Sequence, residues 1–208
     1  MKVLLLNGSP RKNGCTFTAL SEIATRLEKN GIETEFFHIG AEPVGGCRAC
    51  RACMKIRDRC AFGEEDGVNE FIEKLNAADG LVVGSPVYFA SINGNLGSFL
   101  DRVFYAKKDF SGKPAAAIVS CRRGGAGSAF DRLNKYFTIS SMPVVSSQYW
   151  NGVHGNTPEE VRQDLEGLQI MRTLADNMAW LLKCIEAGKK AGIELPKPEK
   201  KIITSFIR

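Results

Sequence analysis

The sequence lacks any run of about 18 apolar residues, the length needed to cross a bilayer as a helix. It has only two histidines, and no paired carboxylates, Ser-His-Asp set or H-E-x-x-H motif that would support hydrolysis. It also lacks a basic run interleaved with aromatic residues, which argues against nucleic-acid binding. Strand-type residues begin at Val3, so we expect no signal peptide, no membrane association and a cytoplasmic protein.

The chain alternates strand-type and helix-type segments over most of its 208 residues. This pattern predicts an α/β fold with a doubly wound, five-stranded parallel sheet. We expect one domain over residues 1–195, with a cysteine-rich loop at 47–60, followed by a tail at 196–208. The predicted strands are 2–7, 33–38, 80–85, 114–120 and 143–148, and the predicted helices are 16–29, 66–77, 93–106, 127–137 and 158–187.

The loop after the first strand has the composition of a phosphate site. It reads Asn7-Gly8-Ser9-Pro10-Arg11-Lys12-Asn13-Gly14-Cys15-Thr16 and leads directly into a helical pattern. Backbone amides at a helix N-terminus bind anions, and an arginine can bond two phosphate oxygens at once. The loop matches neither the ATP-type pattern, which has four residues between its glycines, nor the G-x-G-x-x-G dinucleotide pattern. An ordinary turn capped by Ser9 or Asn13 is the alternative interpretation.

A second strand-then-loop unit, Leu81-Val82-Val83-Gly84-Ser85-Pro86-Val87-Tyr88-Phe89, ends in proline and two aromatic residues. In a parallel sheet, ligands bind beyond the carboxyl ends of the strands, where this loop and the phosphate loop would meet. A phosphate loop beside a loop suited to a flat ring predicts flavin mononucleotide (FMN). The net charge of +5 is compatible with anionic cofactors such as FMN or NADPH. We expect six residues to hold the phosphate: Ser9, Arg11, Asn13, Gly14, Cys15 and Thr16.

The ordered set of motifs resembles the flavodoxin-fold NAD(P)H-dependent FMN reductases, and more closely their iron–sulfur flavoprotein branch. The resemblance rests on Asn7-Gly8-Ser9-Pro10-Arg11 with Gly14 and Thr16, Ala78-Asp79-Gly80, Gly84-Ser85-Pro86-Val87-Tyr88-Phe89, Phe99-Leu100-Asp101-Arg102 and Asn151-Gly152-Val153-His154-Gly155.

The resemblance implies strand order 2-1-3-4-5, an FMN-dependent NAD(P)H oxidoreductase with no obligatory catalytic side chain, and a homodimer or homotetramer. NAD(P)H would be a substrate, and flavin, quinone or another small molecule would accept the electrons. The alternatives are a non-enzymatic electron carrier linked to ferredoxin and a cluster-free NAD(P)H:flavin or quinone reductase. The resemblance also implies which residues border the flavin ring: Pro86, Val87, Tyr88, Phe89, Ser120, Cys121, Arg122 and Gly124.

Four of the seven cysteines form the pattern Cys47-x2-Cys50-x2-Cys53-x6-Cys60. An odd total in a chain without a signal argues against a disulfide framework. A C-x2-C-x2-C core supplies three cluster ligands in bacterial ferredoxins, and four thiolates suit a cubane cluster. The compact spacing is similar to that of the iron–sulfur flavoproteins, which implies a [4Fe–4S] cluster beside FMN.

Other interpretations of the cysteine loop remain open. They are a four-cysteine zinc site, a loop without metal, and a redox-active thiol pair. Against zinc, zinc ribbons use two separated C-x2-C pairs. The cations among the cysteines would stabilise an anionic cluster, or they would form a solvated face, or they would guide an acidic partner or NADPH. These cations are Arg48, Arg51, Lys55, Arg57 and Arg59. In the tail, the apolar residues Ile202–Ile207 are expected to pack on a neighbouring subunit, with simple disorder as the alternative.

Overall fold

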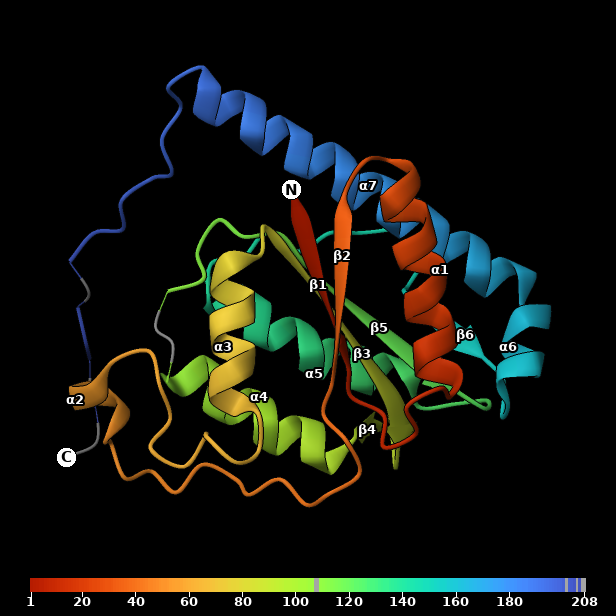
Figure 1. The fold of residues 1–208 in the computed structure, drawn as a ribbon, viewed down its shortest axis with the longest axis horizontal. Helices are drawn as coiled ribbons and strands as arrows, with labels where there is room; N and C mark the ends of the chain where they lie inside the picture. The colour runs from red at the N-terminus through yellow and green to blue at the C-terminus, as the bar shows by residue number, and fades with distance from the viewer. Residues whose placement is uncertain (107–108, 201, 205, 207–208) are drawn as a thin grey trace.

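The computed structural model describes residues 1–106, 109–200, 202–204 and 206. Within these residues, parallel strands form a sheet in the order β2-β1-β3-β5-β6 (Figure 1). The predicted flavodoxin-like fold is therefore confirmed, with β5 and β6 as the fourth and fifth strands of the expected order. A short strand, β4 (Ser91–Ile92), pairs antiparallel with the end of β3. The parallel strands are β1 (Lys2–Asn7), β2 (Glu33–His38), β3 (Gly80–Tyr88), β5 (Ala115–Cys121) and β6 (Gly152–His154).

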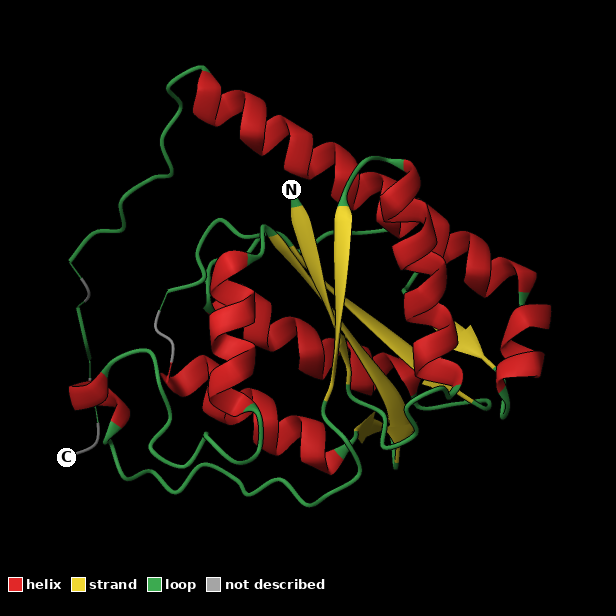
Figure 2. Ribbon diagram, in the orientation of Figure 1, coloured by secondary structure: helices red, strands yellow, loops and turns green. Residues whose placement is uncertain are grey.

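Helices cover both faces of the sheet (Figure 2). One face packs against α1 (Cys15–Lys29), α6 (Pro158–Gln163) and α7 (Leu165–Lys190). The other face packs against α3 (Val68–Ala77), α4 (Gly94–Ala106) and α5 (Ala126–Ile139). A single turn of helix, α2 (Cys53–Ile56), which the sequence pattern did not predict, lies in the cysteine loop.

Alternation along β1 explains how one apolar run serves both faces. Val3 and Leu5 pack in the cluster with α1 and α7, whereas Leu4 and Leu6 pack in the cluster with α3 and α4. All four side chains are fully buried. Successive residues of a strand point to opposite faces, so a strand covered on both sides is apolar throughout.

The prediction of a continuous strand over 143–148 is wrong. Val144 forms an isolated bridge with Ala115 of β5. The chain then leaves the sheet and rejoins it only at β6. Two hydrogen bonds to α7 hold the intervening segment away from the sheet. Asn177 Nδ2 donates to the Ser146 carbonyl at 2.8 Å, and Ser147 Oγ donates to the Ile170 carbonyl at 2.7 Å.

The predicted helix over 158–187 is divided into α6 and α7 at Asp164. This residue has non-helical backbone angles, and its carboxylate accepts the Gly167 amide at 2.9 Å as the cap of α7. It also accepts the His154 amide at 2.7 Å, which ties the start of α7 to β6. Among the residues that the structure describes, none of the helices combines the length and apolarity required of a transmembrane span.

Candidate functional site

The loop between β1 and α1 is fixed by its own hydrogen bonds. The Asn7 side chain accepts the Ser9 amide at 3.1 Å and donates to the Lys12 carbonyl at 3.0 Å. Ser9 Oγ accepts the Arg11 amide at 3.1 Å. His38 Nε2 donates to the Ser9 carbonyl at 2.7 Å, so this histidine has the structural role that its position at the end of β2 suggests. These hydrogen bonds together fix the shape of the loop.

The N-terminus of α1 offers uncapped backbone donors. Gly14 precedes the helix with an extended backbone, no side chain caps the first turn, and the first turn contains no acidic residue. The first amides of a helix have no partner within it and lie at the positive end of its dipole. A Cβ at Gly14 would lie 3.1 Å from Arg11 Cβ, so glycine here leaves room for the arginine. This end of α1 therefore has the donors and the dipole that suit an anion.

Two glycines bring the first and second loops together. Gly8 donates its amide to the Gly84 carbonyl at 2.8 Å. A Cβ on Gly8 would lie 2.4 Å from Leu96 Cδ2, and a Cβ on Gly84 would lie 2.7 Å from Thr16 Cγ2. Real Cβ atoms do not approach so closely, so only glycine permits β1, β3 and the first turn of α1 to pack in this way.

The second loop is a tight β-hairpin. Tyr88 pairs with Ser91, and the two residues between them, Phe89 and Ala90, have φ values of 49° and 56°. Positive φ at both central positions is the pattern of a two-residue type I′ turn. Tyr88 is 46% exposed, and Phe89 is fully exposed. The turn therefore presents an aromatic surface to solvent at the carboxyl end of β3, where the sequence predicts a flat ring.

The third predicted segment, Ser120–Gly124, lies against both the loop between β1 and α1 and the hairpin at the end of β3. Thr16 Oγ1 and Ser120 Oγ are 2.9 Å apart and buried. A Cβ on Gly125, whose φ is 86°, would lie 3.0 Å from Ala90 Cα in the hairpin turn. The Arg122 and Gly124 positions are exposed. The fold therefore brings together the three loops that the sequence nominated.

Two cysteines lie among these loops. Burial raises the pKa of the Cys15 and Cys121 thiols above the ordinary value. Cys15 Sγ lies 3.7 Å from the Gly155 carbonyl, to which a protonated thiol can donate. Both thiols are therefore protonated near neutral pH, which suits a packing role and not that of a nucleophile.

The four motif cysteines line one small cavity of about 20 Å³. Cys53 is buried, Cys60 is half-buried, and Cys47 and Cys50 are exposed. In the described part of the chain, no three His, Cys, Asp or Glu side chains lie close enough together to hold a single metal ion. A cubane cluster instead spreads its four thiolate ligands over separate iron corners. The donor set, four cysteine thiols on one short loop, is chemically suited to such a cluster.

The backbone of the cysteine loop has an unusual conformation. Ala49 and Arg51 lie between the first three cysteines and have φ values of 52° and 58°. Positive φ is uncommon outside glycine. Turns that combine left-handed and right-handed residues direct successive amides into a concavity that binds anions, including iron–sulfur clusters. Positive φ at these two positions is therefore compatible with an anionic group held among the cysteines.

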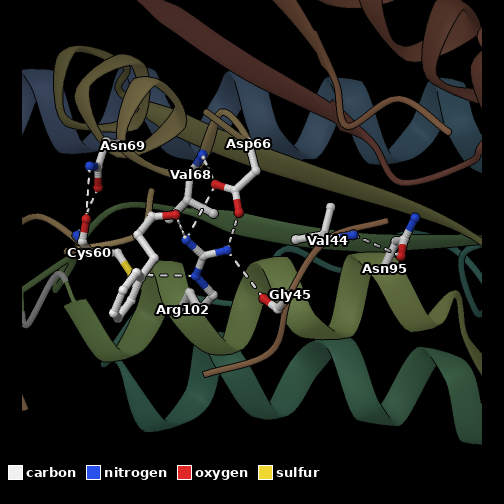
Figure 3. Close-up of polar contacts among 9 residues, drawn as sticks. Val44, Gly45, Cys60, Asp66, Val68, Asn69, Asn95 and Arg102 are labelled. Carbon is white, nitrogen blue, oxygen red and sulfur yellow. Dashed lines mark hydrogen bonds and ion pairs between the residues drawn. The ribbon is translucent and has the colours of Figure 1, made fainter. Parts of the chain in front are cut away.

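Arg102 of α4 fastens the two ends of the cysteine loop together (Figure 3). Its side chain is 3% exposed and forms an ion pair with Asp66. It donates to the carbonyls of Gly45, at 3.2 Å, and Phe62, and its Nε donates to Cys60 Sγ at 3.4 Å. From the sequence, Arg102 was noted only as part of the motif Phe99-Leu100-Asp101-Arg102, with no role of its own. Its signal was an arginine placed three residues after Phe99 and four before Ala106, on the buried face of the helix.

Asn69, which the sequence analysis also missed, holds Cys60 by its backbone (Figure 3). Its side chain accepts the Cys60 amide at 2.8 Å and donates to the Cys60 carbonyl at 3.0 Å. Among the expected cations, Arg59 pairs with Glu64 at 2.7 Å and Glu73 at 2.8 Å. Arg48 lies over the Phe62 ring at 4.4 Å. Both of these cations thus have partners other than the cysteines.

A cavity of about 640 Å³ adjoins the third loop on the side of β6. Gly124 and His154 line it together with Tyr149 and Trp150, whose rings are 5.1 Å apart. The two rings come from the segment that leaves the sheet between Val144 and β6. Because a strand was predicted over residues 143–148 of this segment, the cavity could not be anticipated from the sequence.

The order of the strands and the helices on both faces of the sheet define a flavodoxin-like protein. Residues 1–157 match the model of the NADPH-dependent FMN reductase family, and the chain belongs to that family. It is 31% identical to an iron–sulfur flavoprotein of Methanocaldococcus jannaschii over 89% of this chain and 100% of that protein. A protein of this family is an FMN-dependent oxidoreductase or electron-transfer flavoprotein.

Solved structures show the same fold. RosB, in a complex with 8-demethyl-8-formylriboflavin-5'-phosphate, superposes with a TM-score of 0.69 at 17% identity, over 100% of this chain and 94% of RosB. A flavodoxin from the domain Archaea superposes with a TM-score of 0.60 at 15% identity, over 88% of this chain and 99% of that flavodoxin. At these identities the likeness concerns the fold alone.

Proposed function

We propose that this protein is an FMN-dependent electron-transfer oxidoreductase in which the flavin exchanges electrons with a [4Fe–4S] cluster on the cysteine loop. The observation that carries the proposal is that all four motif cysteines line one cavity in a chain whose three flavin-type loops converge. The name of the M. jannaschii relative, an iron–sulfur flavoprotein, supports the same combination.

In this proposal the α1 N-terminus binds the FMN phosphate. The amides of the first turn and the Arg11 guanidinium donate to its oxygens. In the described structure no side chain caps the first turn, no acidic residue lies in it, and the Arg11 side chain is exposed. The hairpin turn and the loop from Ser120 to Gly124 orient the isoalloxazine ring and exclude water from its faces. FMN supplies hydride and single-electron chemistry when bound, so no protein acid or base is required. The other phosphate contacts proposed are Ser9, Asn13, Gly14, Cys15 and Thr16.

Cys47, Cys50, Cys53 and Cys60 would hold the cluster as thiolates. Zinc is a weaker candidate, because the shared middle cysteine of C-x2-C-x2-C crowds the two pairs that zinc ribbons keep apart. The loop lies apart from the flavin-type hairpin: α2, which begins at Cys53, is well separated from β4 in Figure 1. We therefore place electron transfer across a subunit boundary, between the cluster of one subunit and the flavin of another in a homodimer or homotetramer.

Anaerobic purification tests the proposal directly. We expect FMN, identified by chromatography after release, together with iron, labile sulfide and a broad iron–sulfur absorption. Cys50→Ser should abolish that absorption and leave FMN bound, because the flavin loops lie elsewhere. Cys184→Ser is the matched control, since this exposed cysteine of α7 lies outside the cysteine loop. Wild-type protein with FMN but neither iron nor sulfide would reject the cluster.

A second candidate function is a cluster-free NAD(P)H:flavin or quinone reductase. The cavity of about 640 Å³ beside Gly124 favours it, because this volume suits a nicotinamide or quinone next to the proposed flavin ring. Anaerobic mixing with NADPH or with reduced ferredoxin separates the two functions. Flavin bleaching by NADPH alone supports the reductase, whereas bleaching by reduced ferredoxin alone supports the electron carrier.

A further inference from the structure

The guanidinium of Arg102 lies at the fourth cysteine of the motif with all of its donors engaged. Arginine has five N–H groups in a fixed fork. In Arg102 they face Cys60 Sγ, the carbonyls of Gly45 and Phe62, and both carboxylate oxygens of Asp66. The side chain is 3% exposed, and Asp66 is 22% exposed. One N–H therefore points at a sulfur while the rest fix the orientation of the group.

A buried cation that donates to a ligand sulfur changes the energy of reduction. Adding one electron makes the total charge of a cluster, its thiolate ligands included, more negative by one unit. A positive charge and an N–H···S bond stabilise that added charge, and hydrogen bonds to the sulfurs are an established control of cluster potential. Burial weakens solvent screening, so the interaction is stronger than at the surface. Arg102 would therefore make reduction easier.

Asp66 acts in the opposite sense. Its carboxylate lies on the side of the guanidinium away from the sulfur bond and partly neutralises the cation. Removing this negative charge would leave Arg102 uncompensated and increase its effect on the sulfur. The pair thus has one member that favours reduction and one that opposes it.

We propose that Arg102 and Asp66 are positioning residues that set the reduction potential of the group held by the four cysteines, acting through Cys60. This inference rests on the proposed function. Arg59 provides an internal comparison, because it precedes Cys60 in the chain but is 46% exposed and pairs with Glu64 and Glu73. An exposed and screened cation has little influence on a nearby charge.

The test measures the cluster potential in anaerobically prepared full-length protein, with dithionite supplying one electron per cluster. Arg102→Met removes the charge and keeps an unbranched side chain. We expect a potential more negative than that of wild type. Asp66→Asn keeps the shape and removes the opposing charge, and we expect a more positive potential. Arg59→Gln is the matched control and should leave the potential unchanged.

Arg102→Lys covers the case in which Arg102→Met loses its cluster. Lysine keeps the charge but has three donors and no fork, so the potential of Arg102→Lys should be more negative than that of wild type. Opposite shifts for the two members of the ion pair support the inference, since a merely structural role would move both variants in the same direction. Shifts of one sign, or a shift in Arg59→Gln equal to that in the Arg102 variants, would overturn it. Wild-type protein without iron and sulfide would reject the proposed function itself, whereas iron-loaded protein without opposite shifts rejects only this inference.

Discussion

The hydroxyls of Thr16 and Ser120 lie 2.9 Å apart, although 104 positions separate the two residues in the chain. Thr16 belongs to the first turn of α1, and Ser120 lies near the end of β5, in register with Pro86 of β3. This buried contact therefore joins the loops proposed for the FMN phosphate and the flavin ring.

Thr16→Val should destabilise the fold because it leaves the buried Ser120 hydroxyl without its partner. We expect the free energy of unfolding to fall by about 1–3 kcal/mol. The double variant Thr16→Val with Ser120→Ala should lose less than the sum of the two single variants, since both polar groups are then removed. Urea unfolding of the apoprotein measures all three. Strict additivity would show that the hydroxyls do not interact.

Arg11→Ala should weaken FMN binding by roughly 1.5–3 kcal/mol, the scale of a hydrogen bond to a charged group. Titration of apoprotein with FMN, followed by flavin fluorescence, gives the affinity. Lys12→Ala removes the neighbouring cation and is the matched control, with a smaller loss expected because lysine lacks the two-pronged geometry. If Arg11→Ala bound FMN with the wild-type affinity, the assignment of Arg11 to the FMN phosphate would be contradicted.

Phe89→Ala should separate flavin binding from stability. The side chain is fully exposed at the hairpin turn, so the free energy of unfolding should change by no more than about 0.5 kcal/mol. Loss of an aromatic contact should weaken FMN binding by about 0.5–1.5 kcal/mol. Trp180→Ala, which removes an exposed ring on α7, should leave the affinity unchanged. Equal affinities for both variants would place Phe89 outside the flavin site.

Asp176→Asn should reduce stability in a pH-dependent way. The Arg26 guanidinium, which donates to both carboxylate oxygens at 2.8 Å, lowers the pKa of Asp176. A lowered pKa stabilises the fold at pH values above the unfolded value of about 3.9, and this contribution disappears as the pH falls. The pair is partly exposed, so we expect a loss of about 0.2–1 kcal/mol at pH 7 and a smaller loss at pH 3, which lies below the unfolded pKa.

Urea unfolding at the two pH values measures this difference. Glu186→Gln on the same helix serves as the control, because Glu186 pairs with an exposed lysine within α7 and does not join two elements. A loss in Asp176→Asn that is equal at pH 7 and pH 3 would contradict the assignment.

Removal of the tail after Leu195 should reduce self-association. Ile202, Ile203 and Phe206 are 84–87% exposed, whereas Ile207 lies outside the described residues. Burying such side chains against a second subunit would contribute about 1.5–3 kcal/mol each. Sedimentation at micromolar concentration should show a dimer or larger for the full chain and a smaller species for the truncated one. A monomeric full chain would reject this.

Local patterns were sufficient to predict much of the fold. The apolar run of β1 and the helical spacing of α1 depend on neighbours in sequence, and both elements were predicted within a residue of their ends. The fifth strand could not be predicted in this way. Residues 143–148 have the composition of a strand, but hydrogen bonds from Ser147 and Asn177, one of them 31 residues away from its partner, hold this segment outside the sheet.

The sequence by itself determined which loops would meet and which thiols are available. In a parallel sheet the strand ends lie at one edge, so Ser9–Thr16, Pro86–Phe89 and Ser120–Gly124 had to be neighbours. Only the tertiary structure decided which cation faces the cysteines. Arg59 is adjacent to Cys60 in the chain yet pairs with acids at the surface, whereas Arg102, 42 residues away, reaches its sulfur. Burying a guanidinium requires acceptors for all of its donors, and segments far apart in the sequence supply them.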